Sequence, residues 1–387
     1  MDFRALEEKC VTEARRLEQL VAGLDVPDPL DAMMDEVPLR PVFSICPSIF
    51  EKTPDANQTV KTLCGFTQDE LFELFEVVEP ALEPKRLGRK LGVSPLDSFF
   101  LALCFFHSYG RYSEMARSFN LSRTIAFEAI ERTTIKIAAP LTGKYIRPPG
   151  RASDLLPGVH PFPDAPVIID CMFQPCTKPS GSTLTASKFY SEKHRLNGFK
   201  TETVNCASTG RVFLFNAGIP AATHDLTIYR KNEELCDEFL GDAKLLADLG
   251  YEGINDNKER AVVPIKGSHR TAEEIKHNKA LASVRVTVER FYGRMKLLFR
   301  IMRDQYRGDR ENYPVIASIC IALANFHLLK HPLTDADRKL FCLFDELDTG
   351  KGAAQENRRL DVARRSREKR RKLAEGVDPN QPAEESG

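Results

Sequence analysis

The ten cysteines of this 387-residue chain include no CxxC pair, and no set of cysteines and histidines has zinc-finger spacing. Only Cys171 and Cys176 lie close together in the sequence. Scattered cysteines of this kind are typical of reduced thiols in an intracellular protein. The pattern therefore gives no support to a zinc-finger module.

The chain also lacks a secretory signal and a clear membrane span. Its first 20 residues are highly charged, unlike the apolar core of a signal peptide. The longest apolar stretch, residues 313–329, is interrupted by Asn325 and His327 and lies within a strongly polar chain. This stretch predicts a buried helix, and we expect no membrane association.

The chain has no excess of positive or negative charge, because its 55 Lys and Arg residues balance its 55 Asp and Glu residues. The balance hides an acidic region, residues 1–84, and a basic run, residues 358–372, with nine Lys or Arg against two acids. The basic run predicts a disordered or fraying helical arm that binds nucleic acid, a nuclear import signal, or both. A merely solvated charge run is the alternative. We expect a nuclear protein whose residues 350–387 form a basic and then acidic disordered tail.

The first 145 residues predict helices only. Residues 1–60 read as an N-terminal helix and a Pro- and Asp-rich linker, and residues 61–145 as a helical, DNA-binding region. Here a short helix, 112–119, meets the break "NLS" before a second helix that starts at Ser122, as in a helix-turn-helix. Arg123 and Thr124 would then be exposed for DNA contact. A plain helical hairpin in a bundle is the alternative.

From residue 160 to 335 the pattern changes to a mixed α/β domain. The run "VIID" predicts a buried strand that ends at Asp170, and two β-rich runs joined by "TG" predict a hairpin. A helix follows with Asp225 placed to cap it, then a second buried strand that ends at Asp248. A short strand near residue 261 and a long helix that carries Glu289 complete the order.

The acids of this domain suggest a metal site. Ligands collect where parallel strands end, so Asp170 and Asp248 would meet there, and the long helix would bring Glu289 to them. Two like charges about 4 Å apart repel by roughly 4 kcal/mol at an effective dielectric of 20, so such a cluster must be protonated or bind a cation. Carboxylate ligands select Mg²⁺ or Mn²⁺, and two such ions about 4 Å apart catalyse phosphoryl transfer.

The helix that carries Glu289 also has cations on the same face. Arg285, Gly293 and Lys296 fall on this face, where the cations would hold a phosphate and the glycine would leave room for it. A surface glutamate paired with Arg285 or Arg290 is the alternative interpretation.

A basic run with interleaved aromatics lies at residues 188–200 and predicts a DNA track. Its members are Lys188, Phe189, Tyr190, Lys193, His194, Arg195, Phe199 and Lys200. A solvated hairpin with its aromatics in the core is the alternative. Residues 265–274 form a smaller basic loop of the same kind.

The ordered series "VIIDCMFQP", "KFYSEKHRLNGFKTETVNCAS", "LLADLGYEG" and "SVRVTVERFYGRMKLLFR" resembles the PIF/Harbinger-type DDE transposases and the nucleases domesticated from them. The resemblance covers about residues 164–329 and implies a ribonuclease-H-like fold, divalent metal ions, and DNA strand cleavage and joining. It also implies DNA as a partner, a separate DNA-binding protein from the same element, and allows a homo-oligomer.

Carried onto this sequence, the resemblance implies four metal-binding acids, Asp170, Asp225, Asp248 and Glu289. The strand order favours Asp248 over Asp225 as the second catalytic acid beside Asp170 and Glu289. Asp225 is left as a helix cap, an outer ligand or a partner of Lys or His. Cys171 and Met172 depart from the family pattern, which has a small residue and threonine there.

These observations predict a metal-dependent DNA endonuclease or transposase with a mixed-sheet catalytic domain behind a helical region. We expect DNA contacts from Lys188, Lys193, Arg195, Lys200, Arg285 and Lys296. One alternative is a catalytically inactive, domesticated transposase that only binds DNA. Another is a metal-dependent phosphatase or ribonuclease that uses the same acids.

Overall fold

A computed structural model describes residues 55–83, 93–148, 150–155, 160–180, 183–256 and 259–374. The predicted helix at residues 1–24, most of the linker that follows it, and the last part of the acidic tail lie outside the described residues. Helix α3 begins at Ala56, inside the run expected to be a linker.

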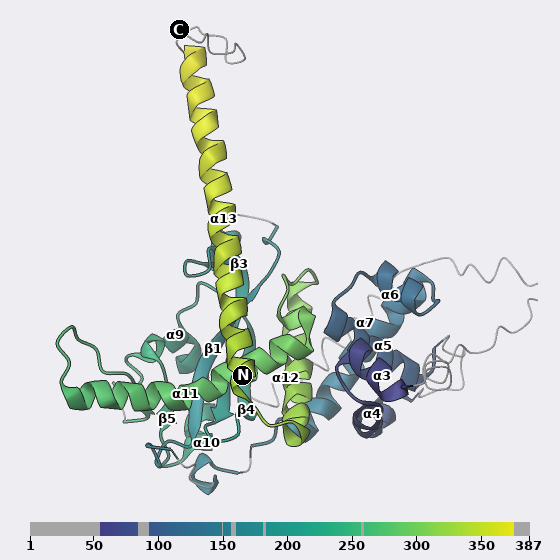
Figure 1. The fold of residues 1–387 in the computed structure, drawn as a ribbon, viewed down its shortest axis with the longest axis horizontal. Helices are drawn as coiled ribbons and strands as arrows, with labels where there is room; N and C mark the ends of the chain where they lie inside the picture. Colours follow the sequence, from purple (N-terminus) through teal and green to yellow (C-terminus); the bar gives the residue numbers. More distant parts are fainter. Residues whose placement is uncertain are drawn as a thin grey trace, which may run out of the picture.

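The N-terminal part is helical, as predicted. It holds α3 (Ala56–Cys64), α4 (Gln68–Leu82), α5 (Pro95–Ser108), α6 (Tyr112–Ser118) and α7 (Arg123–Tyr145). Helix α4 starts at a capping box in which Thr67 and Glu70 exchange side-chain and backbone hydrogen bonds. Helix α5 is apolar on nearly every side and is buried at the centre of this helical group (Figure 1).

The predicted break between two helices lies between α6 and α7. Asn120 takes a left-handed conformation with φ of 52°, and the Ser122 side chain caps α7. Ala116 is buried at the junction, while Arg123 and Thr124 are exposed at the start of α7. Helix α7 then runs for 23 residues, so its C-terminal part reaches the neighbouring domain.

The second part is built on one mixed sheet, which makes the chain an α/β protein. Its strands are β1 (Val167–Pro175), β2 (Tyr190–Ser191), β3 (Leu196–Cys206), β4 (Val212–Pro220), β5 (Leu245–Leu246) and β6 (Ala261–Val262). The order is β2-β3-β1-β5-β6, with β4 also paired to β3. Strands β1, β5 and β6 are parallel neighbours, and the pairs made by β3 are antiparallel.

Strand β1 differs from its prediction because it does not end at Asp170. It continues to Pro175, since β3 pairs with it at every position from Val167 onward. Its parallel neighbour β5 pairs only with Val167 and Ile168. Asp170 therefore lies within β1, two residues past the point where the neighbouring strand stops.

The helix predicted at residues 225–240 is two helices, α9 (Asp225–Lys231) and α10 (Glu233–Leu240). Asn232 interrupts them with a non-helical backbone. The N-cap residue is His224, so the expectation that Asp225 caps the helix is wrong. The structure also has a short helix that the sequence did not predict, α8 (Thr183–Lys188), before β2.

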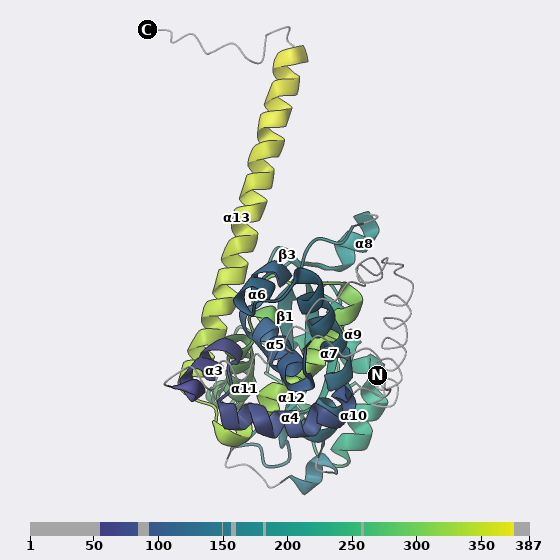
Figure 2. The ribbon, with the colours of Figure 1, turned by 90° about the vertical axis from the view of Figure 1, so that its right-hand side faces the viewer.

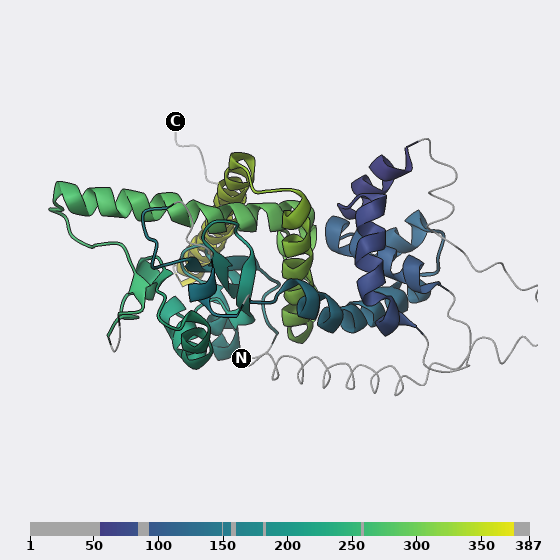
Figure 3. The same ribbon diagram turned by 90° about the horizontal axis from the view of Figure 1, so that it is seen from below.

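Helices cover both faces of the sheet (Figure 3). Helices α11 (Ala272–Leu298) and α12 (Tyr313–Lys330) pack on one face against Ile168 and Met172, and α9 and α10 pack on the other against Val167 and Ile169. Helix α12 is the apolar stretch of the sequence analysis. It is long and apolar enough to cross a membrane, but most of that window is buried inside the protein, as predicted.

The last helix, α13 (Asp335–Ala374), crosses α11 and then leaves the body of the molecule (Figures 1 and 2). It has 40 residues, or about 60 Å at 1.5 Å per residue. Residues 350–374 are thus helical where a disordered tail was expected. Their abundant Arg, Lys, Glu, Ala and Leu have high helix propensity, and the first half of the helix is packed on the domain.

Candidate active site

A cleft of about 880 Å³ opens beside β1 and is lined by all four acids of the sequence analysis. Asp170 comes from β1, Asp225 from the first turn of α9, Asp248 from the residue after β5, and Glu289 from α11. The volume lies in the range of substrate-binding clefts. Four separate elements therefore bring carboxylates to one cleft.

Arg285 links two of these acids. Its Nη2 lies 3.7 Å from Asp170 Oδ2 and 3.7 Å from Asp248 Oδ2. Helix α11 crosses the sheet so that this guanidinium reaches the gap left by the short strand β5. Asp170 and Asp248 are thus close together, as the parallel pairing of β1 and β5 predicts.

Asp225 lies in the same place. A Cβ atom on Gly250 would be 2.7 Å from Asp225 Oδ2 and 2.9 Å from Asp248 Oδ1, so both carboxylates surround this glycine. Lys200 Nζ binds Asp225 Oδ1 at 2.7 Å, and the backbone N–H of Gly250 donates to Asp248 Oδ1 at 2.7 Å. The structure therefore places both acids in the cleft, with Asp248 sharing Arg285 with Asp170 and Asp225 paired with Lys200, and the choice of Asp248 as the second catalytic acid stays a prediction.

Burial raises the pKa of Asp170 to about 7. The Arg285 guanidinium acts in the opposite direction, while the charges of Asp248 and Asp225 raise this pKa further. The three carboxylates thus lie close enough to affect one another, and Asp170 is the most buried of the three. Such a cluster favours the binding of a cation.

Glu289 lines the same cleft but is held by α13. Arg338 Nε donates to Glu289 Oε2 at 3.0 Å, and about a quarter of the Glu289 side chain is exposed. Arg285 and Arg290 were the alternative partners predicted for Glu289. Both form ion pairs elsewhere: Arg285 with Asp170 and Asp248, and Arg290 with Asp335.

The donors fit a hard divalent cation because all are carboxylate oxygens. Within the described ranges, no three Asp, Glu, His or Cys side chains are spaced to hold a metal ion together. Arg285, Lys200 and Arg338 instead occupy the carboxylates in ion pairs. Metal binding at this cleft therefore requires these basic side chains to turn away from the acids.

A hydrogen-bonded layer behind β1 supports the site. Tyr292 of α11 donates to the backbone oxygen of Asp170 at 2.9 Å, and Tyr251 donates to Glu202 Oε1 at 3.1 Å. Burial raises the pKa of Glu202 to about 8. Sequence analysis missed Glu202, although an acid within the β-rich run "FKTETVN" is a signal that marks it.

The two residues that depart from the family pattern have different positions. Met172 is 1% exposed and packs in the main core, away from the cleft. Cys171 lines the cleft, and its Sγ lies 3.4 Å from the Tyr251 hydroxyl. Only Cys171 therefore affects the surface beside the acids.

The predicted DNA track is partly covered by α13. Lys188, Lys193 and Arg195 are exposed, but Lys193 pairs with Asp345 and Arg195 with Glu356. His194 is buried, stacks on Phe173 and has a pKa that burial lowers to about 4. Phe199, one of the aromatic residues of the track, is in the core. This agrees with the alternative prediction of a hairpin whose aromatic residues are buried.

Two residues of the α11 face that were predicted to accommodate DNA pack against α13. Lys296 lines the cleft but is only 2% exposed, and its Nζ lies over the Phe341 ring of α13. Gly293 leaves room for α13 and not for DNA, because a Cβ there would lie 1.8 Å from the Asp337 carbonyl oxygen. Sequence analysis could not show that α13 packs on this face.

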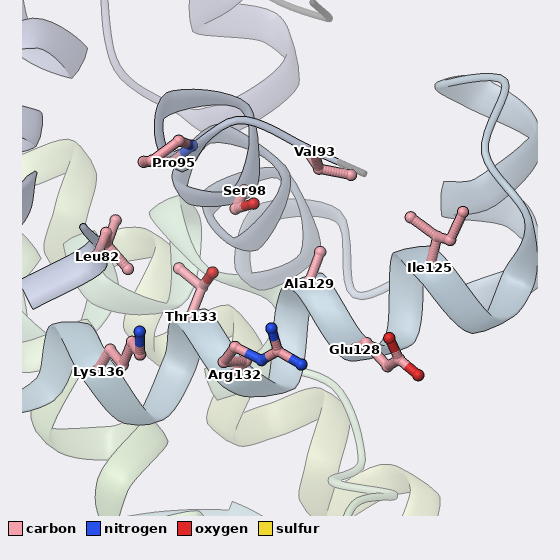
Figure 4. Close-up of a pocket in the computed structure, with 10 residues that line it drawn as sticks. All are labelled: Leu82, Val93, Pro95, Ser98, Ile125, Glu128, Ala129, Arg132, Thr133 and Lys136. Atoms are coloured by element: carbon pink, nitrogen blue, oxygen red, sulfur yellow. The ribbon is translucent and has the colours of Figure 1, made fainter. Parts of the chain in front are cut away.

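A smaller cavity lies in the helical part, between α5 and α7 (Figure 4). Its volume is about 80 Å³, and it is lined by a mixture that includes Leu82, Ile125 and Arg132. It holds no convergent set of acids and is too small for most substrates. The cleft beside β1 is the stronger candidate for a catalytic site.

Comparison with known families agrees with this choice. Residues 169–325 match the family model described as DDE superfamily endonuclease. The match supports that superfamily and, with it, a transposase-like nuclease that acts on DNA. Neither the search of curated proteins nor the search of solved structures found a significant match.

Proposed function

We propose that this protein is a metal-dependent DNA endonuclease or transposase that cuts, and in transposition joins, DNA phosphodiesters in the cleft beside β1. The observation that carries the proposal is the meeting of Asp170, Asp225 and Asp248 at one end of that cleft. Separate elements supply these acids, and burial makes negative charge on Asp170 more costly. Such an arrangement is costly unless a cation binds there.

The finer assignments belong to the same proposal. The sheet would be a ribonuclease-H-like catalytic core of the PIF/Harbinger type, and α6 and α7 would contact DNA as a helix-turn-helix. The exposed Arg123 and Thr124 support that role for α7. A nuclear location and a separate DNA-binding partner follow from the resemblance and from the basic run of residues 358–372.

Asp170, Asp225 and Asp248 would hold Mg²⁺ or Mn²⁺, with Glu289 as a fourth ligand. Bound divalent ions at such a site supply activation of a water or 3′-hydroxyl and stabilisation of the leaving oxygen. The chain's own groups prepare the site. Burial leaves a proton on Asp170 near neutral pH, so this carboxyl must lose that proton before it acts as a ligand.

The basic residues of the cleft have complementary roles. Lys200 holds Asp225 in place through its 2.7 Å ion pair. Arg285 lies between Asp170 and Asp248, where it offsets their repulsion, and it would move to the phosphate as a cation replaces it. Lys193 is exposed and lines the cleft, Lys188 is exposed next to the lining residue Ser187, and both lysines would hold the DNA backbone.

A plasmid-nicking assay with Mg²⁺ or Mn²⁺ tests the proposal. Asp170→Asn, Asp225→Asn and Asp248→Asn should each lower the rate by about 100-fold or more, because each substitution removes a charged ligand. Asp256→Asn is the matched control, since its side chain is 64% exposed and lies outside the cleft. Activity that survives alanine at both Asp170 and Glu289 would overturn the assignment. Faster hydrolysis of RNA or of a small phosphate ester than of DNA would favour the other enzymatic alternative.

One observation favours a second candidate, an inactive transposase that only binds DNA. Each of the four acids pairs with an Arg or Lys side chain. If these ion pairs persist in solution, metal ions are excluded. Binding of DNA without any nicking at millimolar Mn²⁺ would support this candidate over the nuclease.

A further inference from the structure

Helix α13 has two halves of opposite character. Its first half, to Glu356, packs on the catalytic domain through Phe341, through acids such as Asp337 and Asp345, and through Gly352. A Cβ on Gly352 would lie 1.8 Å from the His194 carbonyl oxygen, so this helix turn touches the backbone of the hairpin directly. Four residues further along the helix, Glu356 forms an ion pair with Arg195 at 2.9 Å.

The second half leaves the domain immediately after that contact (Figures 1 and 2). Leu360 is 61% exposed and Val362 is 67% exposed, and the Arg358, Arg364 and Arg365 side chains are exposed as well. Residues 358–372 carry nine Lys or Arg and two acids. The described side chains of this half, three exposed arginines among them, present positive charge to whatever lies beside the domain.

The direction of this half is set by the anchored half. The α13 turn at Gly352 and Glu356 sits against His194 and Arg195, which belong to the hairpin expected to guide DNA into the cleft. A duplex on this hairpin therefore lies near the point where the basic half begins. The basic half would extend the same positive surface away from the cleft.

We propose that residues 358–374 of α13 form a second DNA-binding surface that holds the duplex outside the cleavage site. The proposal rests on the proposed nuclease function only for the location of the cleft. Duplex DNA is the partner because a single α-helix fits the major groove and a chain of phosphates matches a dense run of basic residues.

The dimensions agree with a defined contact. The 17 residues of this surface span about 26 Å at 1.5 Å per residue. Phosphates on one strand recur about every 3.4 Å, so the surface corresponds to about 8 base pairs. The contact is electrostatic, and it adds affinity without sequence preference.

The test compares two full-length variants in duplex binding by fluorescence anisotropy, in EDTA to prevent cleavage. The first carries Arg358→Gln, Arg364→Gln and Arg365→Gln. The control carries Lys330→Gln, Lys339→Gln and Lys351→Gln, which remove the same charge from exposed positions near the anchored half. Circular dichroism checks that both keep their helix content.

The basic-half variant should bind a duplex of about 40 base pairs at least 10-fold more weakly than the wild type. The slope of log K against log salt should become less steep by about 0.9 for each lost phosphate contact. The control should remain within about twofold of the wild type. Equal affinity and slope for the two triple variants would overturn the proposal and would instead favour an acidic protein, such as an import receptor, as the occupant.

The experiment separates this proposal from the nuclease assignment. Asp170→Asn should abolish nicking while it leaves the salt slope of DNA binding unchanged. If the wild type never nicks DNA but the basic-half variant still loses affinity, the nuclease assignment fails and the DNA-binding surface stands.

Discussion

Arg338 of the C-terminal helix binds Glu289 of α11 at 3.0 Å, although 49 residues separate them in the sequence. Glu289 is the helix-borne acid of the candidate site, so a residue that lies beyond the family match at residues 169–325 pairs with one of the candidate acids. Asp345 of the same helix pairs with Lys193 and faces His194. Helix α13 thus interacts both with the candidate metal site and with the DNA track.

Replacing Arg338 with glutamine should release Glu289. We expect Mn²⁺ to bind about two- to fivefold more tightly, because a half-exposed ion pair is worth less than about 1 kcal/mol. The measurement is Mn²⁺ titration followed by electron paramagnetic resonance. Unfolding free energy should change little, since about half of the Arg338 side chain is exposed.

Lys339→Gln is the control for this substitution. Lys339 is the next residue of the same helix and is exposed. Its replacement by glutamine therefore removes the same charge as Arg338→Gln without removing a partner of Glu289. If both variants strengthen Mn²⁺ binding equally, the effect comes from net charge and the specific role of Arg338 is rejected.

The two glycines Gly350 and Gly352 of α13 give a test of how firmly the helix is docked. Gly352→Ala should destabilise the protein by about 1–3 kcal/mol, because the added Cβ would meet the His194 carbonyl at 1.8 Å. Gly350→Ala places its Cβ in open space and should stabilise by about 0.5–1 kcal/mol through helix propensity. Urea denaturation measures both.

Opposite signs for the two substitutions would confirm that the helix packs against the hairpin in solution. A stabilising effect of both would show that α13 is detached from the hairpin.

The sequence predicted the order of the main elements because each depends on local pattern. Local sequence alone predicts the buried strands around Ile168 and Leu246. It also predicts the "TG" hairpin and, from the apolar spacing, helix α11. The parallel pairing of β1 and β5 then brings Asp170 and Asp248 together. The location of the acids in one cleft follows from these features.

The remaining differences between prediction and structure come from contacts between distant segments. β1 extends past Asp170 because β3 pairs with its full length, which no local pattern of β1 reveals. Gly293 and Lys296 were assigned to DNA because the packing of α13 on α11 depends on side chains about 45 residues away. A charged residue on a helix face predicts that a group of opposite charge lies beside it. It does not predict whether that group belongs to DNA or to another segment of the chain.

Glu202 should make stability depend on pH in alkaline solution. Its folded pKa is about 8, above the ordinary value of 4.5, so the folded state holds the proton more tightly than the unfolded state. This contribution is complete below about pH 4.5 and is lost as pH rises through 8. Glu202→Gln removes the titration, and it should stabilise the protein at pH 9 by a few kcal/mol, on the order of 1.4 kcal/mol per pKa unit.

The comparison needs urea denaturation of wild type and variant at pH 6 and pH 9. Asp170 titrates in both proteins, so the difference between them isolates Glu202. A glutamine oxygen still accepts the Tyr251 hydrogen bond, so the variant should match the wild type more closely at pH 6. A variant less stable than the wild type at pH 9 would show that Glu202 is ionised and satisfied in the fold.

The ion pair of Arg294 and Asp337 anchors the start of α13. It predicts a stability that falls at acidic pH, whereas the contribution of Glu202 is lost at alkaline pH. Arg294 binds Asp337 with two bonds of 2.6 and 2.8 Å, and both side chains are at least nine-tenths buried. Burial alone would raise the pKa of Asp337, but the bonds from Arg294 and Thr334 hold it below its ordinary value. The pair therefore stabilises the fold above the unfolded pKa of the aspartate, and this stability is lost as pH falls.

Asp337→Ala should destabilise the protein by about 3–5 kcal/mol at pH 7, because Arg294 is left buried and without its carboxylate. Asp335→Ala is the matched control two residues earlier. Its side chain is 80% exposed in the pair with Arg290, so the loss should stay below about 1 kcal/mol. Once the pH falls well below the ordinary aspartate pKa of 3.8, the difference in stability between wild type and Asp337→Ala should narrow, as urea denaturation at pH 7 and at about pH 2 would measure. Equal losses for the two substitutions would show that the first turn of α13 is not anchored through Arg294.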